Sequence, residues 1–304
     1  MISLLINNNL RHDRCPCCRS SDIGKIGEIG YGKPLMFSSH EISLQRPPEL
    51  WRCGRCKSAF TQNVLPEDVA AGLYAKGAAG ERWSRVPFAQ QKPPEVVQEL
   101  SRYFQPGLRV LDIGCNTGEL LDFAQSRGCV TAGVEFSEAS RIELEKKGHE
   151  AYASLAETGS RQFDVITAFD LIEHLYDVES LLASCRDMLA ENGTLIILTG
   201  DSGCLSARLC GARWWYVKYP EHIVFPSTRF LGQFPGLEQV RWVKTYAAQG
   251  YRTPPLKMLT GCARYMLAGS YAGLPSLGPD HALVVLQRSH GFARQAGVDS
   301  APQS

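Results

Sequence analysis

The sequence predicts an α/β protein in which a doubly wound parallel sheet follows a small cysteine-bound module. Two observations predict this organisation. From Leu108 onward, short apolar runs alternate with amphipathic stretches, which is the rhythm of successive βαβ units. Ahead of them, two C-x-x-C pairs lie close together, whereas the later cysteines are scattered singly. We therefore expect four segments, namely the cysteine module at 1–62, a linker at 63–92, the α/β domain with lid insertions at 93–288 and a flexible tail at 289–304.

Length and composition set the outer limits. The 304 residues have room for one full α/β domain and a smaller unit, and a hydrophobic content of 44% supports an ordinary core. A net charge of +1 gives no electrostatic argument for a nucleic-acid or membrane partner. No stretch approaches the roughly eighteen apolar residues of a membrane span. The opening apolar run lacks a basic start and ends early in three asparagines, so we expect a cytoplasmic protein without a signal peptide.

The cysteines near the N-terminus have the spacing of metal ligands. Cys15 and Cys18 form one C-x-x-C pair, and Cys53 and Cys56 form another. Two intervening residues let both sulfurs of a tight turn face one ion, and two such knuckles complete a tetrahedral thiolate site for zinc. Protein then fills all four positions, so the zinc would be structural, with Cys17 as a spare ligand. The alternative is a set of reduced thiols without metal, since the odd total of 11 cysteines argues against a disulfide framework.

Local patterns predict the elements in chain order. Alternating residues at 23–29 and a segment ending at 50–52 suit short strands of a zinc-ribbon-like module. A proline followed by acids at 66–68 marks one helix start, and prolines at 93–94 precede a helix over 95–104. In the α/β domain we expect strands at 109–113, 131–135, 163–169, 194–199 and 281–287. The helices expected between them cover 118–127, the stretch from the Ser137 cap to Lys147, and a segment with apolar residues at 181, 182, 185, 188 and 189.

The loop after the first strand of the domain is built so that a ligand can approach its backbone. It reads D-I-G-C-N-T-G over 112–118 and resembles motif I of class I methyltransferases that use S-adenosylmethionine (SAM). The acid attracts the cationic amine of SAM and would repel the pyrophosphate of a dinucleotide. Asn116 replaces the usual middle glycine, a mild change because asparagine tolerates positive φ. The resemblance implies a Rossmann-like, seven-stranded sheet with SAM bound at Asp112, Gly114, Asn116 and Gly118.

Residues at the next strand ends extend the expected cofactor site. Glu135 closes the second strand, where a carboxylate can bind both hydroxyls of a ribose. Phe136 can pack on the adenine ring. The acid that often follows the third strand in this superfamily is missing, and Ser154 stands there instead. Contact with adenine would therefore rely on backbone and apolar packing.

Two further segments resemble the same superfamily. The sequence F-D-V-I-T-A-F-D-L-I-E-H-L over 163–175 matches its fourth-strand segment, and N-G-T-L over 192–195 matches the turn into its fifth strand. Asp170 joins the expected cofactor contacts on this basis. The resemblance covers 93–235 and extends to the final strand. It implies a SAM-dependent methyltransferase.

The acceptor side is predicted from a segment that contains a histidine. Residues 219–227 read Y-P-E-H-I-V-F-P-S and resemble a segment of bacterial small-molecule methyltransferases, many of which carry an N-terminal cysteine ribbon. His222 is our candidate base for an acceptor hydroxyl, because an unperturbed imidazole titrates near neutrality. The alternative is a structural role in capping or hydrogen bonding. The aromatic run at 214–216 either shapes the acceptor pocket or packs in the core.

Glu173 and His174 support a second hypothesis. Some quinone-pathway O-methyltransferases of the superfamily use a matching pair to hold a divalent ion near the acceptor. The alternative is that the pair organises the loop after the fourth strand. Further along, apolar residues at helical spacing predict a helix within 254–274, whose role as core, lid or dimer face stays open.

The resulting prediction is methyl transfer from SAM to a small-molecule acceptor, a hydroxyl of a sugar or of a natural-product intermediate. An RNA methyltransferase is the alternative, since some ribosomal RNA enzymes also carry an N-terminal zinc ribbon. The modest excess of basic residues between 11 and 55 gives that alternative limited support, so we do not expect a nucleic-acid partner. A binding module with a vestigial SAM site is disfavoured by the intact motif. The oligomeric state and the methylated atom are not predicted.

Overall fold

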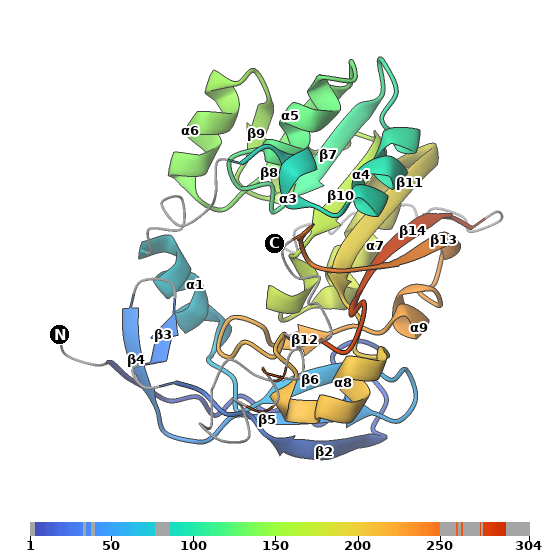
Figure 1. The fold of residues 1–304 in the computed structure, drawn as a ribbon. Coiled ribbons are helices and arrows are strands. Elements are labelled where there is room, and N and C mark those ends of the chain that lie inside the picture. Colours follow the sequence, from blue (N-terminus) through green and yellow to red (C-terminus); the bar gives the residue numbers. More distant parts are fainter. Residues whose placement is uncertain are drawn as a thin grey trace, which may run out of the picture.

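In the computed structural model, a large sheet with helices on both faces lies beside two small sheets (Figure 1). The structure describes residues 4–32, 35–37, 40–76, 86–249, 260, 263, 274 and 276–289. The strands are β1 (Leu4–Ile6), β2 (Ile23–Glu28), β3 (Leu35–Phe37), β4 (His40–Leu44), β5 (Glu49–Cys53), β6 (Ala59–Gln62), β7 (Arg109–Ile113), β8 (Val130–Val134), β9 (Glu150–Tyr152), β10 (Phe163–Phe169), β11 (Leu189–Gly200), β12 (Val224–Phe225), β13 (Leu237–Thr245) and β14 (His281–Arg288).

The helices alternate with the strands of the large sheet, as the sequence predicts for successive βαβ units. The α-helices are α1 (Glu67–Lys76), α3 (Phe88–Gln91), α4 (Pro94–Tyr103), α5 (Glu119–Gln125), α6 (Glu138–Lys146), α7 (Val178–Met188), α8 (Leu205–Cys210) and α9 (Thr228–Leu231). The short 3₁₀ turns are η1 (Leu155–Thr158), η2 (Ile172–His174) and η3 (Gly211–Arg213).

The large sheet has the strand order β13-β14-β11-β10-β7-β8-β9. Strands β9, β8, β7, β10 and β11 run parallel, and β14 is antiparallel to both of its neighbours. This order confirms the seven-stranded, doubly wound fold that the sequence predicts. The chain leaves β7 toward β8 on one side and later returns to β10 on the other. Such a switch point opens a crevice at the carboxyl ends of the strands, where ligands of this fold class bind.

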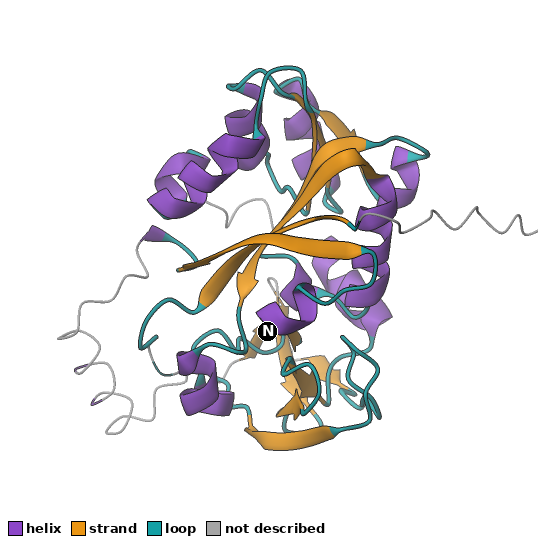
Figure 2. Cartoon of the chain, turned by 90° about the vertical axis from the view of Figure 1, so that its right-hand side faces the viewer, coloured by secondary structure: helices purple, strands orange, loops and turns teal. Residues whose placement is uncertain are grey.

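Side chains along each central strand alternate between two cores. Val110 and Val165 pack with α4 and α5 on one face, whereas Leu111 and Ile166 pack with α7 on the other. This alternation follows from the period of two in a β-strand. Figure 2 shows the helices on both sides of the strands. The sheet is therefore buried on both faces and holds the strand ends that carry the site in fixed positions.

The N-terminal module is joined to the α/β domain through a shared sheet. Its four-stranded sheet has the order β12-β6-β5-β2, and β12 comes from the domain. Val224 and Phe225 pair antiparallel with Phe60 and Ala59. The core of the module is continuous with the core on the α7 face of the large sheet. The predicted boundary at residue 62 falls at the end of β6, but the sequence pattern does not reveal the strand that the domain contributes.

Most predicted elements agree closely with the structure. The strands expected at 109–113 and 163–169 coincide with β7 and β10, whereas β11 begins five residues before the expected position because Leu189 pairs with Phe163. The helix expected within 254–274 and the tail after 289 fall almost wholly outside the described residues. Among the helices that the structure describes, none is long and apolar enough to cross a membrane.

Candidate functional site

The loop between β7 and α5 turns sharply at the carboxyl edge of the sheet. Gly114, Asn116 and Gly118 have φ angles of 74°, 49° and 88°, all in the left-handed region. A Cβ atom on Gly118 would lie 2.5 Å from Cδ2 of Leu144, so only glycine fits between this turn and α6. The left-handed φ of Asn116 agrees with the tolerance expected of asparagine at the middle position. These angles fold the loop into a cradle of backbone at the switch point.

Glu135 connects this cradle to the end of β8. Its Oε2 accepts a hydrogen bond from the backbone amide of Asn116 at 3.0 Å, and its Oε1 accepts one from the amide of Ser137 at 2.9 Å. Both oxygens are held in place and keep further lone pairs for a ligand. The neighbouring ring of Phe136 is 63% exposed and so offers a free face. Ser154 is exposed, at the end of β9 one strand further along the same edge.

Asp112 lies beneath the cradle, not on its surface. It is buried, and its Oδ1 accepts a hydrogen bond from the hydroxyl of Thr167 on β10 at 2.6 Å. Burial raises the pKa of Asp112 to about 7, with the charge of Glu135 adding to the effect. The sequence predicts a freely charged acid. In the structure, the carboxyl also holds β7 and β10 together.

Asp170 has a partner that sequence reasoning missed. It follows β10 with a φ of 47° and forms an ion pair with the ammonium of Lys92. Lys92 also donates to the carbonyl of Ala247 at 3.2 Å. The sequence places Lys92 in the linker, because a lysine before two prolines marks only a helix start. Its role depends on contacts with residues far away in the chain, for which the local sequence gives no signal.

Three residues of the expected acceptor side meet behind the end of β10. The side-chain ligand atoms of Glu173, His174 and His222 all lie within 4.8 Å of one another. The rings of the two histidines meet edge to face, with centroids 4.8 Å apart. The structure therefore brings together two groups of residues that are separated by almost fifty positions and that the sequence suggested for separate roles.

Hydrogen bonds to backbone carbonyls orient both imidazoles. Nδ1 of His174 donates to the carbonyl of Glu221 at 2.9 Å, and Nδ1 of His222 donates to the carbonyl of Tyr216 at 2.8 Å. A carbonyl only accepts, so each Nδ1 carries the proton of its bond, and Nε2 of a neutral His222 ring keeps its lone pair. Burial lowers the pKa of His222 well below its usual value, and the neighbouring His174 lowers it further. This differs from the near-neutral pKa that the sequence predicts, because His222 is only 7% exposed.

Glu173 is buried among hydroxyl groups. The phenol of Tyr216 donates to Oε1 of Glu173, and the hydroxyl of Thr199 donates to Oε2 at 2.9 Å. The backbone carbonyl of Glu173 also accepts from the amide of Ile223 at 2.8 Å. Glu173 thereby ties the end of β10 to the end of β11 and to the 219–227 segment.

The aromatic run at 214–216 surrounds a second buried acid that the sequence analysis missed. Asp280 accepts hydrogen bonds from Nε1 of Trp214 at 3.0 Å and from Nε1 of Trp215 at 2.5 Å. His281 at the start of β14 pairs its Nδ1 with Asp280 at 2.8 Å, and its ring meets that of Tyr216. Trp214 and Tyr216 are thus buried and hydrogen-bonded beside the site. The sequence signal that could have revealed this pair is an aspartate followed by a histidine where the last strand begins. That strand begins beside the carboxyl end of β11, at the edge of the sheet that carries the site.

The four expected cysteine ligands converge in the module. Sγ of Cys15 lies 3.7 Å from Sγ of Cys56, Sγ of Cys18 lies 3.6 Å from Sγ of Cys53, and all four sulfurs are within 4.8 Å of one another. Tetrahedral zinc with Zn–S bonds of about 2.3 Å would separate its sulfurs by about 3.8 Å. Burial raises the pKa of Cys18 to about 11. The donor set and spacing therefore fit zinc, with Cys17 outside the set.

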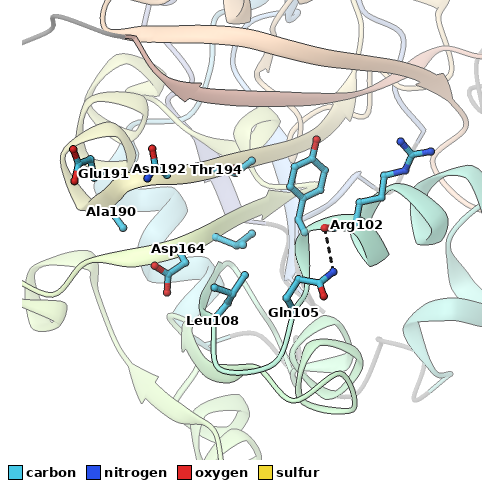
Figure 3. A pocket seen from close by; sticks show the side chains of 10 residues that line it. Arg102, Gln105, Leu108, Asp164, Ala190, Glu191, Asn192 and Thr194 are labelled. Atoms are coloured by element: carbon cyan, nitrogen blue, oxygen red, sulfur yellow. Dashed lines mark hydrogen bonds between the residues drawn. The ribbon is translucent and has the colours of Figure 1, made fainter.

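A separate hollow lies at the opposite edge of the large sheet (Figure 3). It has a volume of about 440 Å³ and is lined by residues near the amino ends of β7, β10 and β11, among them Leu108, Asp164 and Thr194. Asp164 is already paired with Arg109 there. The hollow contains none of the predicted site residues and lies away from the carboxyl edge.

The fold is a Rossmann-like, seven-stranded α/β sheet, and the candidate cofactor residues lie at the ends of its strands. Residues 86–234 match the family model described as a methyltransferase domain. Over these residues the chain is similar to methyltransferase domains, and the motifs that resemble class I SAM-dependent methyltransferases lie within the same range. The match does not extend to the cysteine module.

Curated relatives share part of the chain. The ubiquinone biosynthesis O-methyltransferase of Pasteurella multocida (strain Pm70) is 30% identical over 31% of this chain and 46% of its own length. The protein of the same name from Pseudomonas putida (strain W619) is 34% identical over 31% of this chain and 44% of its own length. The chain thus spans less than half of these relatives.

Solved structures with a similar arrangement include coclaurine N-methyltransferase bound to N-methylheliamine and SAH. It has a TM-score of 0.47 and 18% identity, over 64% of this chain and 72% of that one. A putative sarcosine dimethylglycine methyltransferase from Galdieria sulphuraria has a TM-score of 0.47 and 16% identity, over 64% and 84%. At this similarity, neither acceptor carries over to this chain.

Proposed function

We propose that this protein transfers the methyl group of SAM to a hydroxyl oxygen of a small molecule, such as a sugar or a natural-product intermediate. The observation that carries the proposal is the cradle over 114–118 held against Glu135, at the same sheet edge as the Glu173–His222 cluster. This arrangement supports a cofactor site and an acceptor site side by side. The curated relatives that act as O-methyltransferases support oxygen as the methylated atom.

The chain offers a complementary group for each part of SAM. Glu135 has its carboxylate fixed by two amides and would accept hydrogen bonds from the ribose hydroxyls. Phe136 would cover one face of adenine, with Ser154 near the other end of the base. The backbone of the cradle would receive the amino-acid part, and the positive charge of the SAM amine would favour the ionised form of Asp112 beneath it.

His222 is the proposed base for the acceptor. SAM supplies a methyl group already activated by its sulfonium charge, so the protein mainly aligns the acceptor and accepts its proton. Nε2 of His222 keeps a lone pair for that proton, while the bond from Nδ1 to the carbonyl of Tyr216 fixes the ring. His174 would position this ring through its edge-to-face contact, and Glu173 would do so through Tyr216, whose ring also meets that of His222. The buried surroundings favour the neutral imidazole, which is the form that accepts a proton.

A second role for this cluster is favoured by its geometry. The ligand atoms of Glu173, His174 and His222 lie within 4.8 Å of one another, a spacing that also suits a divalent metal ion. A metal held there would orient an acceptor oxygen instead of receiving its proton. Metal analysis of a variant without the four-cysteine site separates the two roles, because only the metal role leaves bound ion in that variant.

The four-cysteine site is proposed to bind one structural zinc ion. All four ligands come from the protein, so the ion has no open position for catalysis.

The direct test of the proposed methyl transfer is an assay with labelled SAM and a panel of hydroxylated small molecules. Transfer to a small molecule that is lost in Glu135→Ala supports the proposal, and exclusive labelling of RNA would refute it.

A further inference from the structure

The segment that carries His222 is built into the cysteine module. Strand β12 begins two residues after His222 and pairs with β6, which begins three residues after Cys56. The amide of Thr61 on β6 donates to the carbonyl of Ile223 at 2.8 Å. Figure 1 shows β12 beside β6, at the side of the module that faces the large sheet. The candidate base and the second cysteine pair therefore belong to one continuous piece of structure.

Ser227 makes the direct connection to the cysteine pair. Its hydroxyl donates to the carbonyl of Cys56 at 2.5 Å, and its amide donates to the hydroxyl of Ser58 at 3.1 Å. The same hydroxyl accepts from the amide of Phe230 at 3.1 Å and so caps α9. Ser58 and Ser227 are buried, so water does not replace these bonds easily.

A second connection runs parallel to the first. The hydroxyl of Ser202, just after β11, donates to the carbonyl of Lys57, and the amide of Ser202 donates to the carbonyl of Pro226. The position of the 219–227 segment thus depends on two neighbouring carbonyls, that of Cys56 and that of Lys57. At the other end, the amide of Ile223 is bound to the carbonyl of Glu173.

We propose that metal held by the four cysteines positions the acceptor side of the site, with Ser227 as the positioning residue that transmits the constraint to His222. The inference rests on the proposed zinc site and on the proposed methyl transfer. A bound ion fixes the turn from Cys53 to Cys56 and with it the carbonyl that Ser227 binds. Without the ion, nothing joins the four sulfurs, so that turn is free to move and β12 loses its anchor. The cofactor side lies on other strands and keeps its structure.

Hydrogen exchange of the full chain tests this directly. We expect chelation that removes the ion to speed amide exchange of residues 222–227 by about tenfold or more, the scale set by loss of one or two buried hydrogen bonds. Exchange at residues 110–118 and 131–135 should change less than about twofold, and SAM affinity should stay within about twofold.

Two variants test the link while the metal is bound. Ser58→Ala removes the acceptor of the Ser227 amide without touching the cap of α9, and Ser227→Ala removes the bond to Cys56 together with the cap. Both should speed exchange of residues 222–227 and lower kcat with KM for SAM unchanged, whereas Ser227→Thr should restore both values. Ser206→Ala is the matched control, because Ser206 is equally buried but accepts from Leu277 instead.

Three results would overturn the inference. Exchange at 222–227 that is unchanged after measured loss of metal would show that the segment does not depend on the ion. Equal acceleration at 110–118 would show a general loss of fold, and a chain that binds no metal would remove the anchor itself. Amide exchange is measured without a methyl acceptor, so the two proposals can fail separately. If only the proposed methyl transfer is wrong, metal removal still speeds exchange at 222–227 although the protein transfers no methyl group.

Discussion

The amide of Asn116 donates a hydrogen bond to Oε2 of Glu135 at 3.0 Å, so the cradle after β7 and the end of β8 form one rigid unit. This contact fixes the carboxylate in the place where ribose hydroxyls are expected. The carboxylate that we propose binds the ribose is therefore held in place by the loop that follows β7.

Replacing Glu135 tests this part of the site. Glu135→Ala should weaken SAM binding by about 1.5–3 kcal/mol, the range for loss of a hydrogen bond to a charged group. Calorimetry measures the affinity, and Glu138→Ala serves as the control because Glu138 lies outside the proposed site, on the first turn of α6. Equal affinity in the Glu135→Ala protein would mean that this carboxylate does not hold the ribose.

The buried acid Asp112 predicts a dependence of stability on pH. Its pKa is raised from 3.8 to about 7 in the folded protein, so the charged form is disfavoured relative to the unfolded chain. The stabilising contribution is complete below about pH 4 and is lost as the pH rises through about 7, by at most about 4 kcal/mol. Urea unfolding at pH 5 and pH 8 without SAM should show the part of this loss that falls above pH 5, at most about 3 kcal/mol, and Asp112→Asn should reduce it. A loss of the same size in the variant would assign it to other groups.

His222 predicts both a rate and a pH profile. His222→Ala should lower the rate of methyl transfer by about 10²–10⁴, the usual effect of a lost general base, while SAM affinity stays constant. Because burial lowers the pKa of His222, the neutral base persists through neutral pH and is lost only in acid. The native rate should therefore be flat near neutrality and fall at lower pH. His12→Ala, a histidine of the module, is the control; retention of most of the rate by His222→Ala would make that residue structural.

The cysteine cluster predicts one zinc ion per chain. Replacing Cys53 and Cys56 together by serine should abolish its binding and destabilise the module, since two of four thiolate ligands are lost. Metal analysis of the purified proteins gives the stoichiometry. Replacing Cys204, which caps α8, and Cys210, the last residue of α8, should leave the zinc in place, and zinc-free native protein would contradict the assignment.

The large sheet was predictable because its elements carry strong local signals. The apolar runs of β7 and β10 and the glycines around Asn116 reflect constraints within a few residues. The convergence of the four cysteines was predictable for the same reason, since each pair lies in one turn. Lys92, His281 and the pairing of β12 with β6 were not predicted. Their roles depend on contacts between distant segments, and a two-residue strand such as β12 leaves almost no periodic pattern in the sequence.

The near-neutral pKa expected of His222 differs from the structure for a related reason. The sequence gives the type of residue, but the shift comes from burial and from the adjacent ring of His174. Both depend on how the 219–227 segment folds over the end of β10. The sequence thus predicted which residue could act as the base, but it did not predict that the pKa of this residue is lowered.

The most direct test of the account follows the methyl group itself. The purified protein is incubated with SAM labelled at the methyl carbon, together with a panel of hydroxylated sugars and aromatic metabolites and, separately, bulk RNA. We predict transfer of the label to an oxygen of at least one small molecule, with the transfer lost in Glu135→Ala and strongly reduced in His222→Ala. Label that enters only RNA, or a native protein that binds SAM and labels none of these acceptors, would contradict the account.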